Sequence, residues 1–239
     1  MASYHHQDGR YGSLPQTLTV HGQWTKLKSM NLCGATPKDK LCLIEMQTGY
    51  SGRPPLGMRT GFILRDGMSS KDPVLAAAGD EVPGLHAFNP NGIVFLPRLE
   101  FDADTKPHGE SLDTEVMRAE PGLNDDVAFH FSIEVGEVGE EGRREEFAWR
   151  RVKEGKKKGF KLVRVDKDDE PQVAFLEWVM AWPKLTHAFT LQLAEGQAEE
   201  LGGRWVLMVA VTAIRLYTLY VKGKTNKLVV DMGRGGSEK

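Results

Sequence analysis

The stretch RWVLMVAVTAIRLYTLYVK, residues 204–222, decides the fold of this chain. Trp205–Ile214 carries no charge, and apolar residues continue on both sides of Arg215. A helix that is apolar around its whole circumference is enclosed on every side, by a protein core or by a membrane. A glycine pair precedes the stretch, and Gly223 occupies a position that often ends a helix. We therefore predict one buried helix over residues 204–222.

A membrane-spanning helix is the alternative interpretation of the same stretch. The uninterrupted apolar run is about half of the roughly 20 residues that a bilayer requires. Arg215 lies inside the stretch, and a charged side chain at membrane depth is costly. The sequence therefore favours a core helix, and we expect no transmembrane span.

The composition is that of a folded domain with little net charge. The chain has 239 residues, a formal net charge of −2 and 40 % hydrophobic residues. A domain of this size can bury a sizeable core. A dedicated nucleic-acid binder is usually basic as a whole, so a nucleic-acid partner is not expected. We predict a disordered leader over residues 1–13, a single domain over residues 14–232 and a disordered tail over residues 233–239.

The two cysteines and the polar amino terminus indicate the cellular compartment of the protein. Residues 1–13 show no signal peptide, and Cys33 and Cys42 lie in neighbouring strand-like segments. Thiols of cytosolic proteins usually stay reduced. We therefore expect a cytoplasmic protein with two free thiols.

Most of the chain before residue 194 consists of short β-type runs separated by turn residues. In VAFHFSIEV, residues 127–135, apolar and polar side chains alternate, which is typical of a strand with one buried face. EEFAWRRV and GFKLVRV, joined by a lysine-rich turn, predict a β-hairpin. Residues 102–126 are acidic and rich in turn residues and predict a long loop, whereas KLVVDM, residues 227–232, predicts a closing strand.

These runs together predict a mainly β fold. We expect a closed antiparallel β-barrel of about twelve strands, threaded by the C-terminal hydrophobic helix. Closure is the natural arrangement because it removes the exposed edges of the sheet.

Several short sequence segments, taken in their order along the chain, resemble the tubby-like superfamily. This superfamily includes tubby C-terminal domains, phospholipid scramblases and LURP-one-related proteins. The resemblance covers roughly residues 17–231 and is to fungal-type members. It is carried by LCLIEMQTGYSG at 41–52, DPVLAA at 72–77, FAWRR at 147–151, FKLVR at 160–164 and the helix at 205–219. The resemblance implies a closed barrel of about twelve strands around a hydrophobic helix. The chain lacks the proline-rich and cysteine-rich amino-terminal regions of scramblases, so scrambling is not expected.

Positive charge gathers in one segment, residues 143–167, which we call the basic hairpin. Its basic residues are Arg143, Arg144, Arg150, Arg151, Lys153, Lys156, Lys157, Lys158, Lys161, Arg164 and Lys167, against the acidic residues Glu145, Glu146, Glu154 and Asp166. Such a segment creates a local positive field that can hold the phosphates of lipid headgroups or of other ligands. The resemblance implies the same chemistry, because tubby-like proteins bind phosphoinositides with basic side chains on the barrel wall.

We therefore predict a non-catalytic barrel, peripheral at membranes, that binds anionic headgroups. The predicted ligand-binding residues are Arg150, Arg151, Lys156, Lys157, Lys158 and Lys161. The alternative for the hairpin is a solvated turn whose lysines protect an edge from aggregation. The alternative function is an enzyme or carrier for a small molecule, with a pocket at the barrel mouth.

The sequence contains no motif that supports catalysis or a cofactor. Glu100, Asp102 and Asp104 alternate along the chain but do not fit a calcium loop, and the seven histidines show no metal-ligand spacing. GKT, residues 223–225, ends a helix rather than opening one, so it is no phosphate-binding loop. We expect no metal and no cofactor, and leave the catalytic residues, the ligand and the oligomeric state open.

Overall fold

A computed structural model describes residues 14–22, 28–50, 52–83, 90–98, 112–121, 126–136, 143–154, 157–165, 167, 169–179, 187–227 and 230–231, with the backbone alone at 153, 154 and 157. The strands are β1 Thr17–Gly22, β2 Ser29–Cys33, β3 Lys40–Thr48, β4 Thr60–Arg65, β5 Val74–Asp80, β6 Gly92–Pro97, β7 Leu112–Pro121, β8 Val127–Val135, β9 Arg143–Glu154, β10 Lys157–Arg164, β11 Gln172–Trp178 and β12 His187–Leu193. One helix follows, α1 Gln197–Val221. The predicted leader and tail lie outside the described residues.

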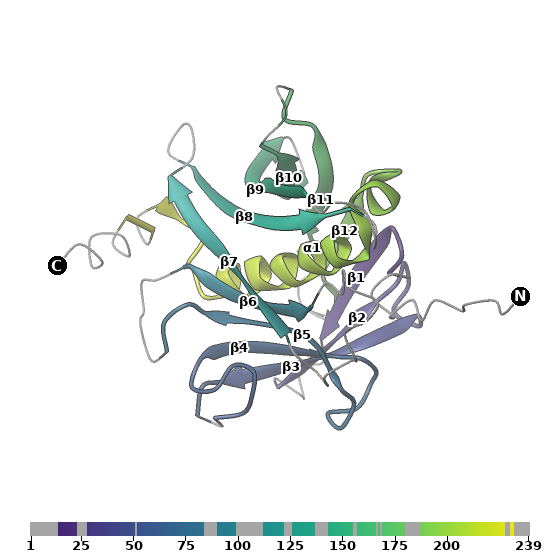
Figure 1. The fold of residues 1–239 in the computed structure, drawn as a ribbon, viewed down its shortest axis with the longest axis vertical. Coiled ribbons are helices and arrows are strands. Elements are labelled where there is room, and N and C mark those ends of the chain that lie inside the picture. Colours follow the sequence, from purple (N-terminus) through teal and green to yellow (C-terminus); the bar gives the residue numbers. More distant parts are fainter. Residues whose placement is uncertain are drawn as a thin grey trace, which may run out of the picture.

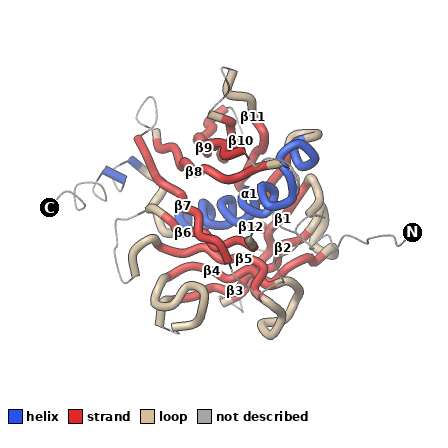
Figure 2. The backbone as a smooth tube through the Cα atoms, in the orientation of Figure 1, coloured by secondary structure: helices blue, strands red, loops and turns tan. Residues whose placement is uncertain are grey.

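The twelve strands form a closed antiparallel barrel in which each strand pairs with its neighbours in sequence and β1 pairs with β12. The strands surround α1, as the red tube around the blue helix shows in Figure 2. The predicted fold, a closed barrel of about twelve strands with a central C-terminal helix, is confirmed.

Alternation along each strand sets which side chains fill the barrel. In β8, Phe129, Phe131 and Ile133 are buried in the core, whereas His130 and Glu134 face outward. Branched and aromatic residues suit this pleated, half-buried setting. The inner face of the sheet and the whole circumference of α1 therefore form one continuous core.

Strand β7 corrects the prediction of a long acidic loop over residues 102–126. Residues 112–121 form a strand in which Glu115, Met117 and Ala119 point inward, and residues 99–111 lie outside the described residues. The inward acid is matched by Arg204 of α1, whose Nη2 donates to Glu115 Oε1 at 3.3 Å. Within the described part of this stretch, the acid Glu115 therefore belongs to an ion pair inside the barrel.

A second correction concerns KLVVDM, which we expected to close the barrel as a strand. The barrel is instead closed by the pairing of β1 with β12. Lys227, Val230 and Asp231 are helical, and Val230 packs into the core. The chain has already left the sheet at this point, so an apolar run here has no neighbouring strand to pair with.

The helix confirms the prediction for residues 204–222 and begins seven residues earlier, at Gln197. Gly202 departs from helical geometry, with φ 82° and ψ 164°, so a short turn from Gln197 precedes the core segment. A side chain at Gly202 would have its Cβ 2.9 Å from the carbonyl oxygen of Gly136. Only glycine fits this conformation and this close approach to β8.

At its other end α1 stops in a Schellman motif, as Gly223 led us to expect. The Lys224 amide donates to the Leu219 carbonyl at 2.8 Å, and the Gly223 amide donates to the Tyr220 carbonyl at 3.0 Å. Gly223 has φ 69°, the left-handed conformation that this motif requires. The helix is long and apolar enough to cross a membrane, but most of it is enclosed by the strands.

The direction of α1 defines two ends of the barrel. In Figure 1, α1 runs from right to left, and its C-terminal end lies on the same side as the end of β7. We call the described connections at that end, together with the segment after α1, the carboxyl rim. The connections at the opposite end, where α1 starts, form the amino rim.

Candidate functional site

The basic hairpin is built from β9 and β10, whose register pairs Arg151 with Phe160 and Arg150 with Lys161. Opposed residues of an antiparallel pair share one face of the sheet. Phe160 belongs to the core, so Arg151 lies on the inner face and Arg150 lies with Lys161 on the outer face. The predicted ligand-binding residues are therefore divided between two faces of the wall.

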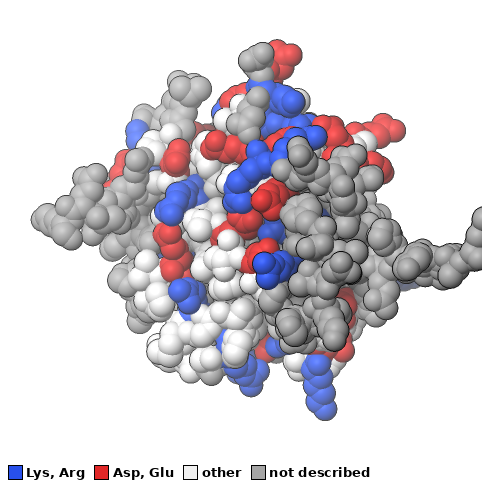
Figure 3. All heavy atoms as spheres, in the orientation of Figure 1, with Lys and Arg blue, Asp and Glu red and all other residues white. Residues whose placement is uncertain are grey.

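The five arginines of the basic hairpin all have protein partners. The hydrogen bonds and ion pairs join Arg143 to Glu145 and Glu200, Arg144 to Glu115, Arg150 to Glu170, Arg151 to Thr225, and Arg164 to Glu145 and Glu200. Figure 3 shows basic and acidic side chains mixed across this face of the molecule. The arginines therefore act first as structural links.

Arg150 and Arg151 each link the hairpin to another segment of the chain. Arg150 contacts both carboxylate oxygens of Glu170, which fixes the connection after β10 to the outer wall. Arg151 Nη2 donates to the Thr225 carbonyl at 2.6 Å, and its guanidinium lies 5.7 Å from the centre of the Phe160 ring. Arg151 thus fastens the segment after α1 to the rim of the barrel.

The lysines of the basic hairpin differ from the arginines. Lys158 is exposed and Lys161 is half-buried, and neither side chain makes an ion pair or hydrogen bond with any residue that the structure describes. Lys156 lies outside the described residues, and the side chain of Lys157 is not described. Among the described side chains of β9 and β10, the positive charge that remains for a ligand is therefore carried by Lys158 and Lys161.

Residues 222–227, KGKTNK, form a basic segment directly after α1. It contains Lys222, Lys224 and Lys227 and no acid. Partial burial lowers the pKa of Lys222 and of Lys224, although the Asp80 carboxylate opposes the shift in both. The signal that could have found it is the position of three lysines directly after an apolar helix.

The interior offers no support for a carrier that uses the barrel lumen. Along α1 the side chains from Arg204 to Leu216 are buried, and they meet the inward residues of the strands. The polar indole N–H of Trp149 also has a partner inside the barrel, since Nε1 donates to Thr212 Oγ1 at 3.0 Å. Within the described residues the lumen is thus occupied by the protein itself.

Three histidines, His21, His130 and His187, lie on the polar faces of strands. His130 Nδ1 lies 3.3 Å from Glu146 Oε1, and the rings of His21 and His187 stack with centroids 4.5 Å apart. In the part of the chain that the structure describes, no cluster of three or more histidine, cysteine or acidic side chains could hold a metal. Glu100, Asp102 and Asp104 lie outside that part.

Cys33 and Cys42 are both buried, and neither forms a disulfide, as expected. Burial raises the pKa of the Cys33 thiol, opposed by Lys40. A buried thiol of raised pKa is a weak nucleophile.

No protein-family model, curated protein or solved structure matches this chain.

Proposed function

We propose that this protein is a non-catalytic cytoplasmic barrel that binds anionic headgroups, such as those of phosphoinositides, through its basic hairpin. The observation that carries the proposal is the difference between the arginines and the lysines of the hairpin. The arginines are bound to protein partners, whereas the side chains of Lys158 and Lys161 make no ion pair or hydrogen bond with a described residue. We further infer that the protein belongs with the tubby-like barrels, because a closed barrel of twelve strands around a C-terminal apolar helix agrees with what the resemblance implies.

The arginine links help the lysines to bind. Arg151 holds the segment after α1 against β9, and Arg150 holds the connection after β10. A wall fixed in this way holds the strand that carries Lys158 and Lys161, so less of it has to become ordered on binding, which favours affinity. Each basic residue near an anionic surface contributes about 1 kcal/mol, so three lysines at the turn supply roughly a hundredfold in affinity.

Co-sedimentation with liposomes tests the proposal. The wild type and a Lys156/Lys157/Lys158→Ala variant are compared on phosphoinositide-containing vesicles at low and high salt. Binding of the wild type should fall with added salt, because exposed charges are screened within about 8–10 Å. The variant should bind roughly a hundredfold more weakly at low salt.

A matched control removes the same charge from the amino rim. Lys38, Lys40 and Lys71 are exposed there, and their triple alanine variant should bind as the wild type does. Equal binding by the hairpin variant and the wild type would show that the hairpin is only a solvated turn. A small-molecule enzyme or carrier would then be the better interpretation.

A further inference from the structure

Exposed apolar side chains are concentrated at one end of the barrel. Among the described residues the exposed large hydrophobic side chains are Tyr50, Met58, Met68, Val82, Tyr220 and Val221. The strand order places all of them except Met68 at the carboxyl rim. Scattered exposed apolar residues are normal, but such a bias toward one end of a closed barrel marks that end as a candidate interaction surface.

The same end carries an excess of positive charge. The described basic residues of the carboxyl rim are Lys28, Arg53, Arg59, Lys222, Lys224 and Lys227, and the acidic ones are Glu81, Asp126 and Asp231. At the amino rim the balance is reversed, with Lys38, Lys71, Arg98 and Lys167 against Asp39, Asp66, Asp72, Asp169, Glu170 and Glu195. The carboxyl rim is thus both the apolar and the basic end of the barrel.

The end of α1 combines both properties within a few residues. Val221 is 66 % exposed and Tyr220 is 38 % exposed, and Lys222 follows directly. The Tyr220 ring stacks on Trp178 of β11, with centroids 5.0 Å apart and planes at 15°. The Schellman motif and the Arg151–Thr225 hydrogen bond hold the lysines beside this aromatic pair.

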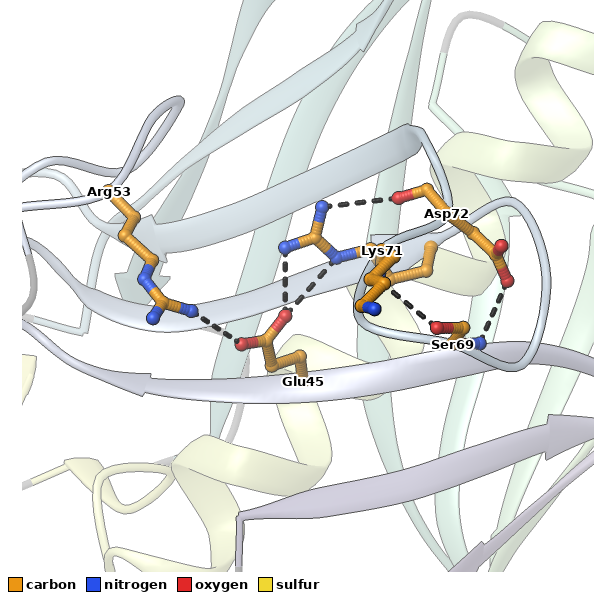
Figure 4. Close-up of polar contacts among 6 residues, drawn as sticks. Glu45, Arg53, Ser69, Lys71 and Asp72 are labelled. Carbon is orange, nitrogen blue, oxygen red and sulfur yellow. Dashed lines mark hydrogen bonds and ion pairs between the residues drawn. The ribbon is translucent and has the colours of Figure 1, made fainter.

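The second apolar group lies on the connection between β3 and β4. Tyr50 and Met58 are 82 % and 63 % exposed, while Leu56 between them is fully buried against the outer wall. Figure 4 shows Arg53 of this connection reaching Glu45 of β3, at 3.4 Å. The connection is therefore anchored to the barrel while its two apolar tips face solvent.

We infer that the carboxyl rim docks on an anionic lipid bilayer, with Tyr50, Met58 and Val221 entering the interface and the lysines after α1 contacting lipid phosphates. The inference rests on the proposed binding of anionic headgroups and adds the orientation of the barrel on the membrane. The end of β9 and the start of β10 lie at the same rim. A single orientation therefore brings the hairpin lysines, the apolar tips and residues 222–227 to one surface.

A bilayer fits this surface better than a protein partner does. Protein interfaces are depleted in lysine, whereas residues 222–227 contain three. Tyrosine and tryptophan are enriched where membranes meet water, and lysine extends its charged end to the phosphates above a buried stem. Apolar burial and attraction to anionic lipids add together in interfacial binding.

The test compares variants on anionic and neutral vesicles that contain brominated lipid, which quenches tryptophan fluorescence on contact with the acyl region. A Tyr50/Met58/Val221→Ser variant should lose quenching and bind anionic vesicles at least about tenfold more weakly. Met68→Ser removes an exposed apolar side chain from the amino rim and should behave as the wild type. A Lys28/Lys222/Lys224→Ala variant should also bind more weakly than the Lys38/Lys40/Lys71→Ala control.

The outcomes separate this inference from the proposed function. If the serine variant binds and is quenched as the wild type, the docking inference fails while headgroup binding by the hairpin stands. If the serine variant is defective and the hairpin lysine variant is not, docking stands and the hairpin proposal fails. Binding of soluble inositol phosphates without binding of vesicles overturns docking alone. A wild-type dimer in solution that becomes a monomer in the serine variant would show that the rim binds a second copy of the chain. This result would also overturn docking.

Discussion

Arg215 near the end of α1 donates from Nη2 to Asp80 Oδ1 of β5 at 2.6 Å, across 135 positions of sequence. Arg215 is 1 % exposed, and Gly92 of β6 leaves the room that its guanidinium occupies. Burial lowers the pKa of Arg215, and the Asp80 carboxylate opposes that shift. With Arg204 bound to Glu115 near the other end, the apolar helix is held by a buried ion pair at each rim.

The Asp80 ion pair yields a prediction on stability. Asp80→Ala leaves the Arg215 charge buried without its carboxylate, and breaking a buried pair from one side costs about 3–5 kcal/mol. Urea denaturation should show this loss. An Arg215→Met/Asp80→Leu double variant, which removes both charges, should lie much closer to the wild type. An Asp80→Ala curve that overlays the wild type would show that the pair does not hold the helix.

Val209 lies fully buried at the middle of α1, where a charge has no partner available. Val209→Asp should prevent folding, because an unpaired buried charge costs several kcal/mol against a total stability of about 5–15 kcal/mol. Val221→Asp changes the same residue type at the exposed end of the same helix and should fold normally. Circular dichroism and size-exclusion chromatography measure both variants, and a native Val209→Asp protein would contradict the enclosed helix.

Glu200 predicts how stability depends on pH. A hydrogen bond from Arg164, at 2.6 Å, lowers the pKa of Glu200. A depressed carboxyl pKa stabilises the folded state above the unfolded value, near pH 4.3, and that contribution is lost as pH falls through the folded value. The difference in melting temperature between the wild type and Glu200→Gln should therefore be largest near neutral pH and vanish toward about pH 3.

Glu199 provides the control for this measurement. It lies one position earlier in α1, is exposed, and makes no ion pair with a described residue. Glu199→Gln should show little pH-dependent difference from the wild type. A Glu200→Gln difference that stays constant down to about pH 3 would exclude the ionised pair as its cause.

Cys33 and Cys42 predict slow thiol chemistry in the folded state. Cys33 is 0 % exposed and Cys42 is 4 % exposed. Under native conditions a maleimide should add slowly to either residue, and in denaturant the mass should rise by two adducts. Rapid double addition to the native protein, or an intact mass that shows a disulfide, would contradict two enclosed reduced thiols.

The sequence predicted those elements whose pattern depends on near neighbours. The apolar circumference of α1 and the alternation in β8 both gave the right structure. Strand β7 was missed because a buried acid such as Glu115 is stable inside the barrel only with a partner. That partner is Arg204, which is 89 positions away in the sequence. The KLVVDM run was counted as a strand because its composition cannot reveal that β1 and β12 already pair with each other.

The basic hairpin was found for the same local reason, since its charges are adjacent in the sequence. What the sequence could not reveal is which of those charges are already used. Arg151 is bound by Thr225 from the segment after α1, and Arg150 by Glu170 from the next connection. The carboxyl rim was missed entirely, because its exposed residues come from segments that only barrel closure brings to one end.

The position of α1 at the end of the strand order has a consequence for synthesis on the ribosome. Translation delivers β1 to β12 before the side chains that fill their interior exist, since the core segment of α1 begins after Gly202. Until then the inward faces of all twelve strands have only one another to pack against, a situation that favours aggregation. Nascent chains stalled before residue 203 should therefore depend on chaperones, and the native barrel should form only after α1 has left the exit tunnel.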